Sequence, residues 1–283
     1  MTQPAKPAPV PLLSILPPRR WTPLSLRELW LYRDLLYTLA ERDIKVRYKQ
    51  TLLGIIWVVL QPLIAAAIFA FVFGHIAKMS SDGAPFLVFS YAGLLGWNLF
   101  NSTLTRASAS VVENARLVSK VYFPRLMLPV STLGATLIDF FVSTGLLVVL
   151  MLIYRIAPGW QLILLPFWMC LLLAAAIGLG LYISALMVSY RDLQYALPPF
   201  LQLMLYACPV AYSISNLHVS PRILSLYYLN PLASILEGFR WSILGVGTIN
   251  WGAVAYSTAV TLVMLVGGVL AFKRMERRFA DVL

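Results

Sequence analysis

The sequence predicts an all-α protein that crosses a membrane several times. Of its 283 residues, 60% are hydrophobic and only 12% are charged, whereas soluble domains carry about 25% charged residues. The long apolar runs alternate poorly between apolar and polar residues, which favours helices over a membrane β-barrel. Six runs approach or exceed the ~20 residues that a helix needs to cross the hydrocarbon core. These predicted spans lie near residues 52–73, 86–104, 126–154, 162–188, 197–212 and 251–272, in a single transmembrane domain of residues 50–283.

Two segments precede the first predicted span. Residues 1–23 are rich in proline, which predicts a disordered or extended tail. Residues 24–49 carry apolar side chains at helical spacing among charged ones, so we predict an interfacial amphipathic helix in the headgroup plane of the membrane. Its apolar face comprises Leu29, Tyr32, Leu36 and Leu39, and its aromatic anchors are Trp30 and Tyr37.

The basic residues predict how the spans are oriented. Six spans place both termini on one side of the membrane. With the termini inside, the inner segments hold 18 lysine and arginine residues and the outer segments hold 4. Inner loops of membrane proteins carry the excess of positive charge, so both termini are predicted to be cytoplasmic. The same distribution accounts for the net charge of +11 without a nucleic-acid partner.

The longest polar interruption between spans is Arg106–Arg125, RASASVVENARLVSKVYFPR. It holds four basic residues and one acid, and Pro124 is predicted to end its helix. The apolar spacing predicts one amphipathic helix that is too short to cross the membrane. Such a helix lies on the bilayer surface or docks on a partner, and we interpret it as a cytosolic docking element. Its apolar face would comprise Val111, Ala115, Val118 and Tyr122.

The segment between the fifth and sixth spans predicts an outer helical hairpin. Ser220-Pro221 and Asn230-Pro231 each have the pattern of an N-cap followed by proline at the first helical position. The apolar run that begins at Pro231 is too short to span the membrane. We therefore predict a re-entrant hairpin over residues 220–245 that enters from the outside, before the last span.

Charged residues are few in the predicted membrane region. Glu237 and Arg240 are three residues apart and are predicted to form a structural ion pair in the hairpin, with a pore-side role as the alternative. Asp139 is the only carboxylate within a predicted span, which makes it a functional candidate. Ser143 lies one helical turn further on and could satisfy Asp139 locally, so a packing role is an equal alternative.

The sequence lacks the patterns of an enzyme. It contains no G-x-x-x-x-G-K-[ST] nucleotide-binding loop. Its two histidines and two cysteines have no metal-binding spacing, and Cys170 and Cys208 are interpreted as apolar filler. No catalysis, cofactor or metal is expected in this chain itself. The sequence instead predicts a transport component that is powered by another protein.

Four stretches together resemble the membrane subunits of ABC transporters of the type-2 exporter class, most closely those that export O-antigen, capsule or teichoic-acid polysaccharides. They are RDIKVRYKQTLLGIIWVVLQPL (Arg42–Leu63), NARLVSKVYFPRLMLP (Asn114–Pro129), SYRDLQYALPPFLQLMLYACPVAY (Ser189–Tyr212) and LNPLASILEGFR (Leu229–Arg240). The resemblance extends from about Leu24 to the end of the chain. The proline-rich tail lies outside it.

The resemblance implies a permease in the bacterial inner membrane that acts as one half of a transporter. Two copies would form the pathway, and two separate ATPase subunits would bind ATP and Mg²⁺. The segment 114–124 would be the coupling helix seated in a cleft of the ATPase. The implied ATPase contacts are Asn114, Arg116, Leu117, Lys120, Val121, Tyr122 and Phe123.

The translocation pathway is expected to be lined partly by aromatic residues, because aromatic rings stack on sugars. The candidates are in the first and fifth spans: Trp57, Gln61, Phe69, Tyr206 and Tyr212. For each aromatic residue the alternative is an interfacial or packing role. Tyr206 and Cys208 lie about 200° apart on a helix, so only one can face the pathway, and we expect Tyr206 to do so.

The leading hypothesis is export of a lipid-linked polysaccharide, powered by the partner ATPase. One alternative within the same transporter class is export of a small amphipathic drug or lipid. A third hypothesis, a membrane-bound glycosyl or acyl transferase, requires clustered Asp, Glu or His at a membrane face. The sequence offers only Arg191-Asp192 there, which is interpreted as a loop cap.

Overall fold

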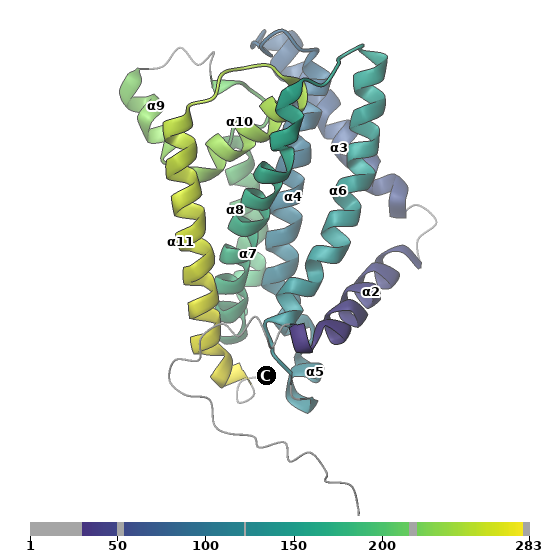
Figure 1. The fold of residues 1–283 in the computed structure, drawn as a ribbon, viewed down its shortest axis with the longest axis vertical. Helices are drawn as coiled ribbons and strands as arrows, with labels where there is room; N and C mark the ends of the chain where they lie inside the picture. The colour runs from purple at the N-terminus through teal and green to yellow at the C-terminus, as the bar shows by residue number, and fades with distance from the viewer. Residues whose placement is uncertain (1–29, 50–53, 122, 215–219, 280–283) are drawn as a thin grey trace, which may run out of the picture.

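The computed structural model describes residues 30–49, 54–121, 123–214 and 220–279, and every regular element within these ranges is a helix. The predicted all-α class is therefore confirmed for the described part of the chain. The predicted tail of residues 1–23 lies outside it. The long helices run side by side, with α2 and α5 at one end of the bundle and α9 and α10 at the other (Figure 1).

The helices of the bundle follow the predicted spans with shifted ends. The first is α3 (Gly54–Phe69), which contains Pro62 and continues as the π-helix η1 (Ala70–Ile76). The others are α4 (Phe86–Glu113), α6 (Met127–Ile153), η2 (Trp160–Leu164) leading into α7 (Leu165–Ser189), α8 (Leu193–Ala207), and α11 (Trp251–Met275) followed by η4 (Glu276–Arg278).

Four of these helical segments are long and apolar enough to cross a membrane: Ile56–Ile76, Met127–Ile153, Trp160–Ser189 and Trp251–Met275. The remaining two predicted spans correspond to α4 and α8. Helix α4 has 28 residues, so its length of about 42 Å is sufficient, but polar residues occupy one face. Helix α8 has 15 residues and ends before Pro209, because the residue that precedes a proline is pushed out of the helical conformation.

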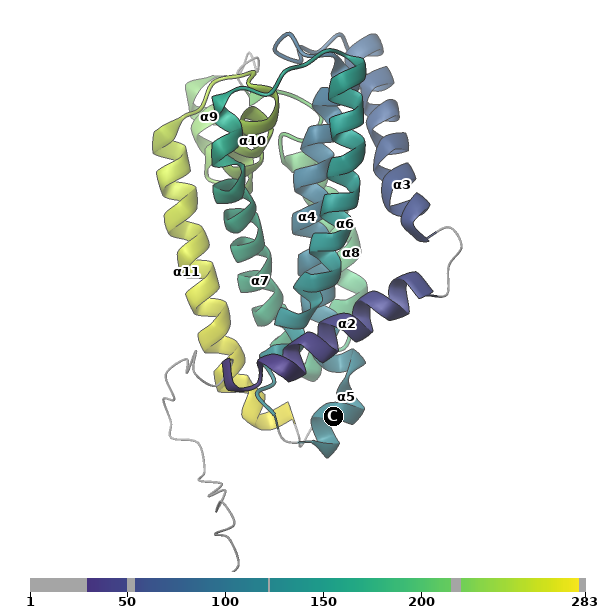
Figure 2. The same cartoon turned by 45° about the vertical axis from the view of Figure 1, so that its right-hand side comes forward.

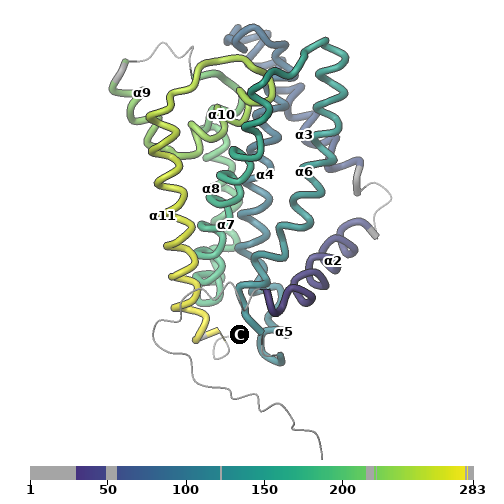
Figure 3. The backbone as a smooth tube through the Cα atoms, in the orientation of Figure 1, coloured from purple at the N-terminus to yellow at the C-terminus, as the bar shows by residue number. Residues whose placement is uncertain are grey.

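The core is organised around α4, which packs against α3, α6, α7 and α10. Its largest fully buried side chains include Phe89, Tyr91 and Phe100, and Trp168 of α7 and Phe239 of α10 join the same apolar cluster. A second cluster lies towards the end that carries α2 and α5, where α2, α6 and α11 converge around Leu39, Met127 and Phe272. The tube in Figure 3 shows how α4 lies between its neighbours.

Helix α2 (Arg33–Lys49) lies obliquely across one end of the bundle, as an interfacial helix would (Figure 2). It packs on α6, where Gly134 allows a close approach: a Cβ at Gly134 would lie 3.1 Å from the Cβ of Ala40. Leu39 is buried, whereas Trp30 and Tyr37 are exposed. Of the predicted apolar face, Leu39 is buried and Leu36 half-buried, whereas Tyr32 is exposed and Leu29 lies outside the described residues, so the predicted face is confirmed only in part.

The predicted docking helix differs in its boundaries. The first half of Arg106–Arg125 is the end of α4, and the chain then turns at Asn114 into the short helix α5 (Ala115–Lys120). At Asn114 the backbone leaves the helical conformation, and its side-chain amide donates to the carbonyl of Ser110 (2.8 Å). Val111 and Val118 are buried as predicted, and Tyr122 lies outside the described residues.

The two helices predicted after the fifth span are α9 (Pro221–Tyr228) and α10 (Pro231–Leu244). Asn230 caps α10 as predicted, since its side-chain oxygen accepts from the backbone N–H of Leu232 (3.1 Å). Ser220 precedes Pro221 as predicted but makes no capping hydrogen bond. Gly245 ends α10 with φ +70°, a conformation that suits glycine.

Candidate translocation site

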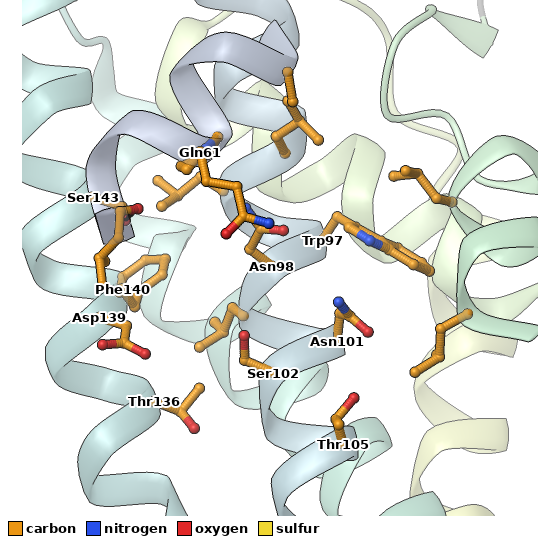
Figure 4. A pocket seen from close by; sticks show the side chains of 18 of the residues that line it. Gln61, Trp97, Asn98, Asn101, Ser102, Thr105, Thr136, Asp139, Phe140 and Ser143 are labelled. Atoms are coloured by element: carbon orange, nitrogen blue, oxygen red, sulfur yellow. Dashed lines mark hydrogen bonds between the residues drawn. The ribbon is translucent and has the colours of Figure 1, made fainter. Parts of the chain in front are cut away.

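A cavity of about 590 Å³ lies between α3, α4, α6 and α8. Helix α4 forms its floor, and α3, α6 and α8, which all contact α4, supply its walls. Figure 4 shows the side chain of Gln61 reaching from α3 towards Asn98 on α4. Ten of the polar side chains around this space come from five helices: Arg47, Gln61, Asn98, Asn101, Ser102, Thr105, Thr136, Asp139, Ser143 and Gln202.

The floor of the cavity is a polar face of α4. Asn98, Asn101, Ser102 and Thr105 are spaced by three, one and three residues, so all four lie on one side of the helix. The remaining faces of α4 pack in the apolar core. Sequence reasoning missed this site, although the helical spacing of these four residues within and beyond the second predicted span was a usable signal.

The walls contribute two more amides. Gln61 of α3 and Gln202 of α8 both line the cavity and are exposed. The expectation that Gln61 faces a polar space agrees with its position. Ala65, one turn further along α3, lines the same cavity.

The predicted aromatic residues lie elsewhere. Trp57 and Tyr206 are 54% and 57% exposed, but neither is among the side chains around this cavity. Phe69 packs against the core and meets Phe73 edge-on. The hydroxyl of Tyr212 lies 2.8 Å from that of Tyr227, near α9. The aromatic contribution to the pathway therefore stays a prediction. Cys208 is fully buried, but it follows the end of α8 in an extended conformation, so the helical spacing that placed it opposite Tyr206 does not apply.

An ionic cluster around Asp139 borders the cavity. One oxygen of its carboxylate accepts from Arg47 of α2 (2.8 Å) and from Arg106 of α4 (2.7 Å). The other accepts from the hydroxyl of Tyr48. Asp139 is 9% exposed, so the carboxylate is mostly covered by protein and is stabilised there by two guanidinium groups.

This cluster excludes the alternative that Ser143 satisfies Asp139 locally. Ser143 instead donates to the carbonyl of Val58 in α3 (3.3 Å), and its own carbonyl accepts from Tyr91 (3.0 Å). Arginine donors outcompete a hydroxyl for a buried carboxylate because charge-assisted hydrogen bonds are stronger. Asp139 therefore joins α2, α4 and α6 rather than packing within α6.

Tyr48 completes the cluster from the interfacial helix. Burial, together with the hydrogen bond to Asp139, raises the pKa of Tyr48 to about 12. The phenol therefore keeps its proton at neutral pH and acts as a donor to the carboxylate. Through Arg47 and Tyr48, the end of α2 is attached directly to the edge of the cavity.

The predicted coupling residues divide into exposed and buried groups. Arg116, Lys120 and Val121 are exposed at the end of the bundle, Asn114 and Leu117 are half-buried, and Tyr122 is not described. Phe123 is only 5% exposed and packs inside the chain's own second core cluster. The expectation that Phe123 is a contact surface is corrected here, because an apolar ring beside the start of α6 is buried by its own bundle.

The exit from this segment is held to the end of α11. The guanidinium of Arg125 donates to the backbone carbonyl of Glu276 and lies 5.8 Å from the ring centre of Phe279. Arg106, at the start of the polar segment Arg106–Arg125, is bound by Asp139, and Arg125 at its end is bound by Glu276. Both ends of the segment that contains α5 are therefore attached to the helical bundle.

The predicted ion pair in the outer hairpin is not formed. Arg240, 2% exposed, donates to the carbonyl of Pro209 (2.6 Å) and lies 4.0 Å from the ring centre of Phe89. Among the described residues, no oxygen of Glu237 comes within 4.0 Å of its guanidinium. The local spacing placed both residues on one side of α10, but packing directs Arg240 towards Pro209, which follows α8, and towards α4, where it fastens the hairpin to the bundle.

Comparison with known proteins identifies the family. The model of the ABC-2 type transporter family matches residues 34–244, which include the cavity, the Asp139 cluster, α5 and α10. The chain belongs to the ABC-2 type transporter family. It is thus a multi-pass permease component of the class that the resemblance indicated.

Curated relatives cover most of the chain. An O-antigen export system permease protein of Myxococcus xanthus is 30% identical over 76% of this chain and 82% of its own length. An O-antigen export system permease protein of Klebsiella pneumoniae is 28% identical over 88% of this chain and 95% of its own length. A polysialic acid transport protein of Escherichia coli is 27% identical over 83% of this chain and 91% of its own length.

Proposed function

We propose that this permease forms the transmembrane pathway for ATP-driven export of a lipid-linked polysaccharide from the cytoplasm. The observation that carries the proposal is the similarity, over 76–88% of the chain, to permeases named for O-antigen export. The polar cavity supports it, since a membrane protein needs a hydrated route to pass a sugar polymer. ATP and Mg²⁺ would bind to a separate ATPase subunit, because the sequence has no nucleotide-binding loop.

We propose that two copies of the chain and two ATPase subunits make the working transporter. Exposed apolar side chains on α3 and α8 flank the cavity, among them Ile68 and Leu203. A second copy facing these helices would enclose the polar floor of α4 and shield it from lipid. The proposed location is the bacterial inner membrane, with both termini, α2 and α5 on the cytoplasmic side.

In this proposal α4 and α8 are the two remaining spans. Polar residues on α4 face the cavity rather than lipid, which supports a membrane-spanning helix of lower hydropathy. Helices α9 and α10 would be the outer re-entrant hairpin. The burial of α10 against α4, α7 and α11 supports this, because non-spanning backbone at membrane depth is tolerated where protein covers it.

A second cavity favours the alternative of a small amphipathic cargo. It has about 260 Å³, lies among α4, α6, α7 and α10, and is apolar. Leu95 and Phe140 line both cavities. The larger, amide-lined cavity suits a polar polymer better than a drug, and we therefore retain polysaccharide export.

The first prediction tests the proposed function. Deleting the gene in its host is expected to remove the polysaccharide from the cell surface and leave it inside the cell. Immunoblotting of surface and cytoplasmic fractions with a polymer-specific antibody measures both pools, and the wild-type gene should restore export. Normal surface polymer in the deletion strain, with increased sensitivity to amphipathic drugs, would favour the alternative cargo.

The second prediction concerns coupling. Changing both Arg116→Glu and Lys120→Glu reverses two exposed charges on α5 and is expected to weaken co-purification of the ATPase while membrane insertion stays normal. The matched control is Arg155→Glu, an exposed arginine that follows α6 at the end of that helix away from α5. If the double variant retains its ATPase and exports polymer at the wild-type rate, α5 is not the docking element.

A further inference from the structure

Four amide side chains share the large cavity without a hydrogen bond of their own. Gln61 of α3, Asn98 and Asn101 of α4, and Gln202 of α8 all line it. Within the described part of the chain, no side-chain hydrogen bond is formed by any of the four. Gln61 and Gln202 are exposed and Asn98 and Asn101 are half-buried, so all four amides are open to the cavity, and each would cost roughly 1–3 kcal/mol if it met only apolar groups there. The cavity therefore needs water or a polar ligand to satisfy them.

The charge of the cavity narrows the class of ligand. Among the described residues, the charged side chains that line the cavity are Arg47 and Asp139, and these two bind each other at its edge. Arg106 also binds Asp139, so this cluster carries one net positive charge, but both guanidinium groups are engaged by the carboxylate, and the part of the lining that holds the four amides is uncharged. Each amide offers two donors and a carbonyl acceptor, which matches hydroxyl groups that both donate and accept. The lining thus suits an uncharged, hydroxyl-rich ligand.

The arrangement along α4 suits a ligand that moves. Successive polar groups from Asn98 to Thr105 are separated by about 1.5–4.5 Å of helix rise. A linear chain sliding along this face would exchange one weak partner for the next. Passage through a membrane protein requires binding that is weak and distributed over several positions.

We infer that the four amides, Gln61, Asn98, Asn101 and Gln202, form a binding site for the uncharged sugar units of a polymer in transit. The inference rests on the proposed function and deepens it by naming the contacts. Asn98 and Asn101 form the floor of the site, and Gln61 and Gln202 approach from its two walls. Hydrogen bonding to sugar hydroxyls, rather than stacking on Trp57 or Tyr206, holds the chain here.

The third prediction tests this contact by photo-crosslinking. A photoreactive benzoylphenylalanine is introduced at position 98 or 101 in the complete transporter, in cells that are exporting polymer. The matched control is position 103, because Thr103 is fully buried away from the cavity. Illumination is expected to attach polymer, detected by antibody, at 98 and 101 but not at 103. Crosslinks at 57 or 206 alone, with export continuing, would overturn the site.

A second measurement keeps the test independent of the bulky probe. The pair Asn98→Leu and Asn101→Leu removes two hydrogen-bonding groups at similar volume and is expected to slow export by about tenfold. Glutamine at both positions should restore most of the rate. Membrane level and co-purification with the ATPase confirm folding, and a wild-type export rate in the folded leucine pair would overturn the inference.

The outcomes separate the two proposals. If wild-type protein with its ATPase exports no polysaccharide, the proposed function and this site both fail. If it exports polymer while 98 and 101 stay uncrosslinked and the leucine pair is unimpaired, only the sugar site fails.

Discussion

Replacing Gly268 with alanine is expected to destabilise the permease strongly. Helices α7 and α11 pack at this point with their backbones in close approach, and a Cβ at Gly268 would overlap the carbonyl oxygen of Gly178. A Cβ at Gly178 would in turn lie 2.7 Å from the backbone of Leu265. These obstacles are backbone atoms, which cannot rotate away, so the two helices must separate. Overpacking of this kind costs about 1–3 kcal/mol, and we expect the upper end.

The adjacent glycine provides a matched control. A Cβ at Gly267 would meet no atom within 4 Å, so Gly267→Ala changes composition and helix propensity without a clash. Thermal unfolding of the purified proteins in the same detergent measures both variants. We expect a clearly lower Tm for Gly268→Ala and a Tm near wild type for Gly267→Ala. Equal Tm values would mean that α7 and α11 do not pack through this glycine.

Replacing Asp139 with asparagine is expected to have the second large effect. It leaves Arg47 and Arg106 facing each other without the carboxylate that both of them bind. Removing one partner of a buried ion pair costs roughly 3–5 kcal/mol. Because the Arg47 side chain is 40% exposed, we expect a value near or below the lower end of that range. Export should fall as well, since α2 loses its attachment at the edge of the cavity.

The control for this variant is Asp192→Asn, which neutralises an exposed carboxylate at the start of α8. Denaturation in detergent compares the two, and a double-mutant cycle with Arg106→Leu measures how much of the loss belongs to the pair. We expect a coupling energy of about 1 kcal/mol or more between Asp139 and Arg106. If Asp139→Asn is as stable as Asp192→Asn, the cluster does not hold the three helices together.

The sequence by itself determined the helical class and most helix positions. Long apolar runs satisfy their backbone polar groups only as helices in lipid, so α6, α7 and α11 follow directly from composition. Local chemistry also determined individual ends. Asn230 caps α10 through a hydrogen bond two residues away, which short-range spacing predicts.

Only the tertiary structure decided which polar residues act together. Asp139 lies 91 residues from Tyr48 and 33 from Arg106, so no local pattern could pair them. The local rule that paired Glu237 with Arg240 failed for the same reason: the guanidinium reached a carbonyl 31 residues away. The four amides likewise belong to helices that are distant in the chain. Their common cavity exists because α3, α6 and α8 each contact α4 and leave part of its polar face uncovered, and helix packing depends on contacts between side chains that are far apart in sequence.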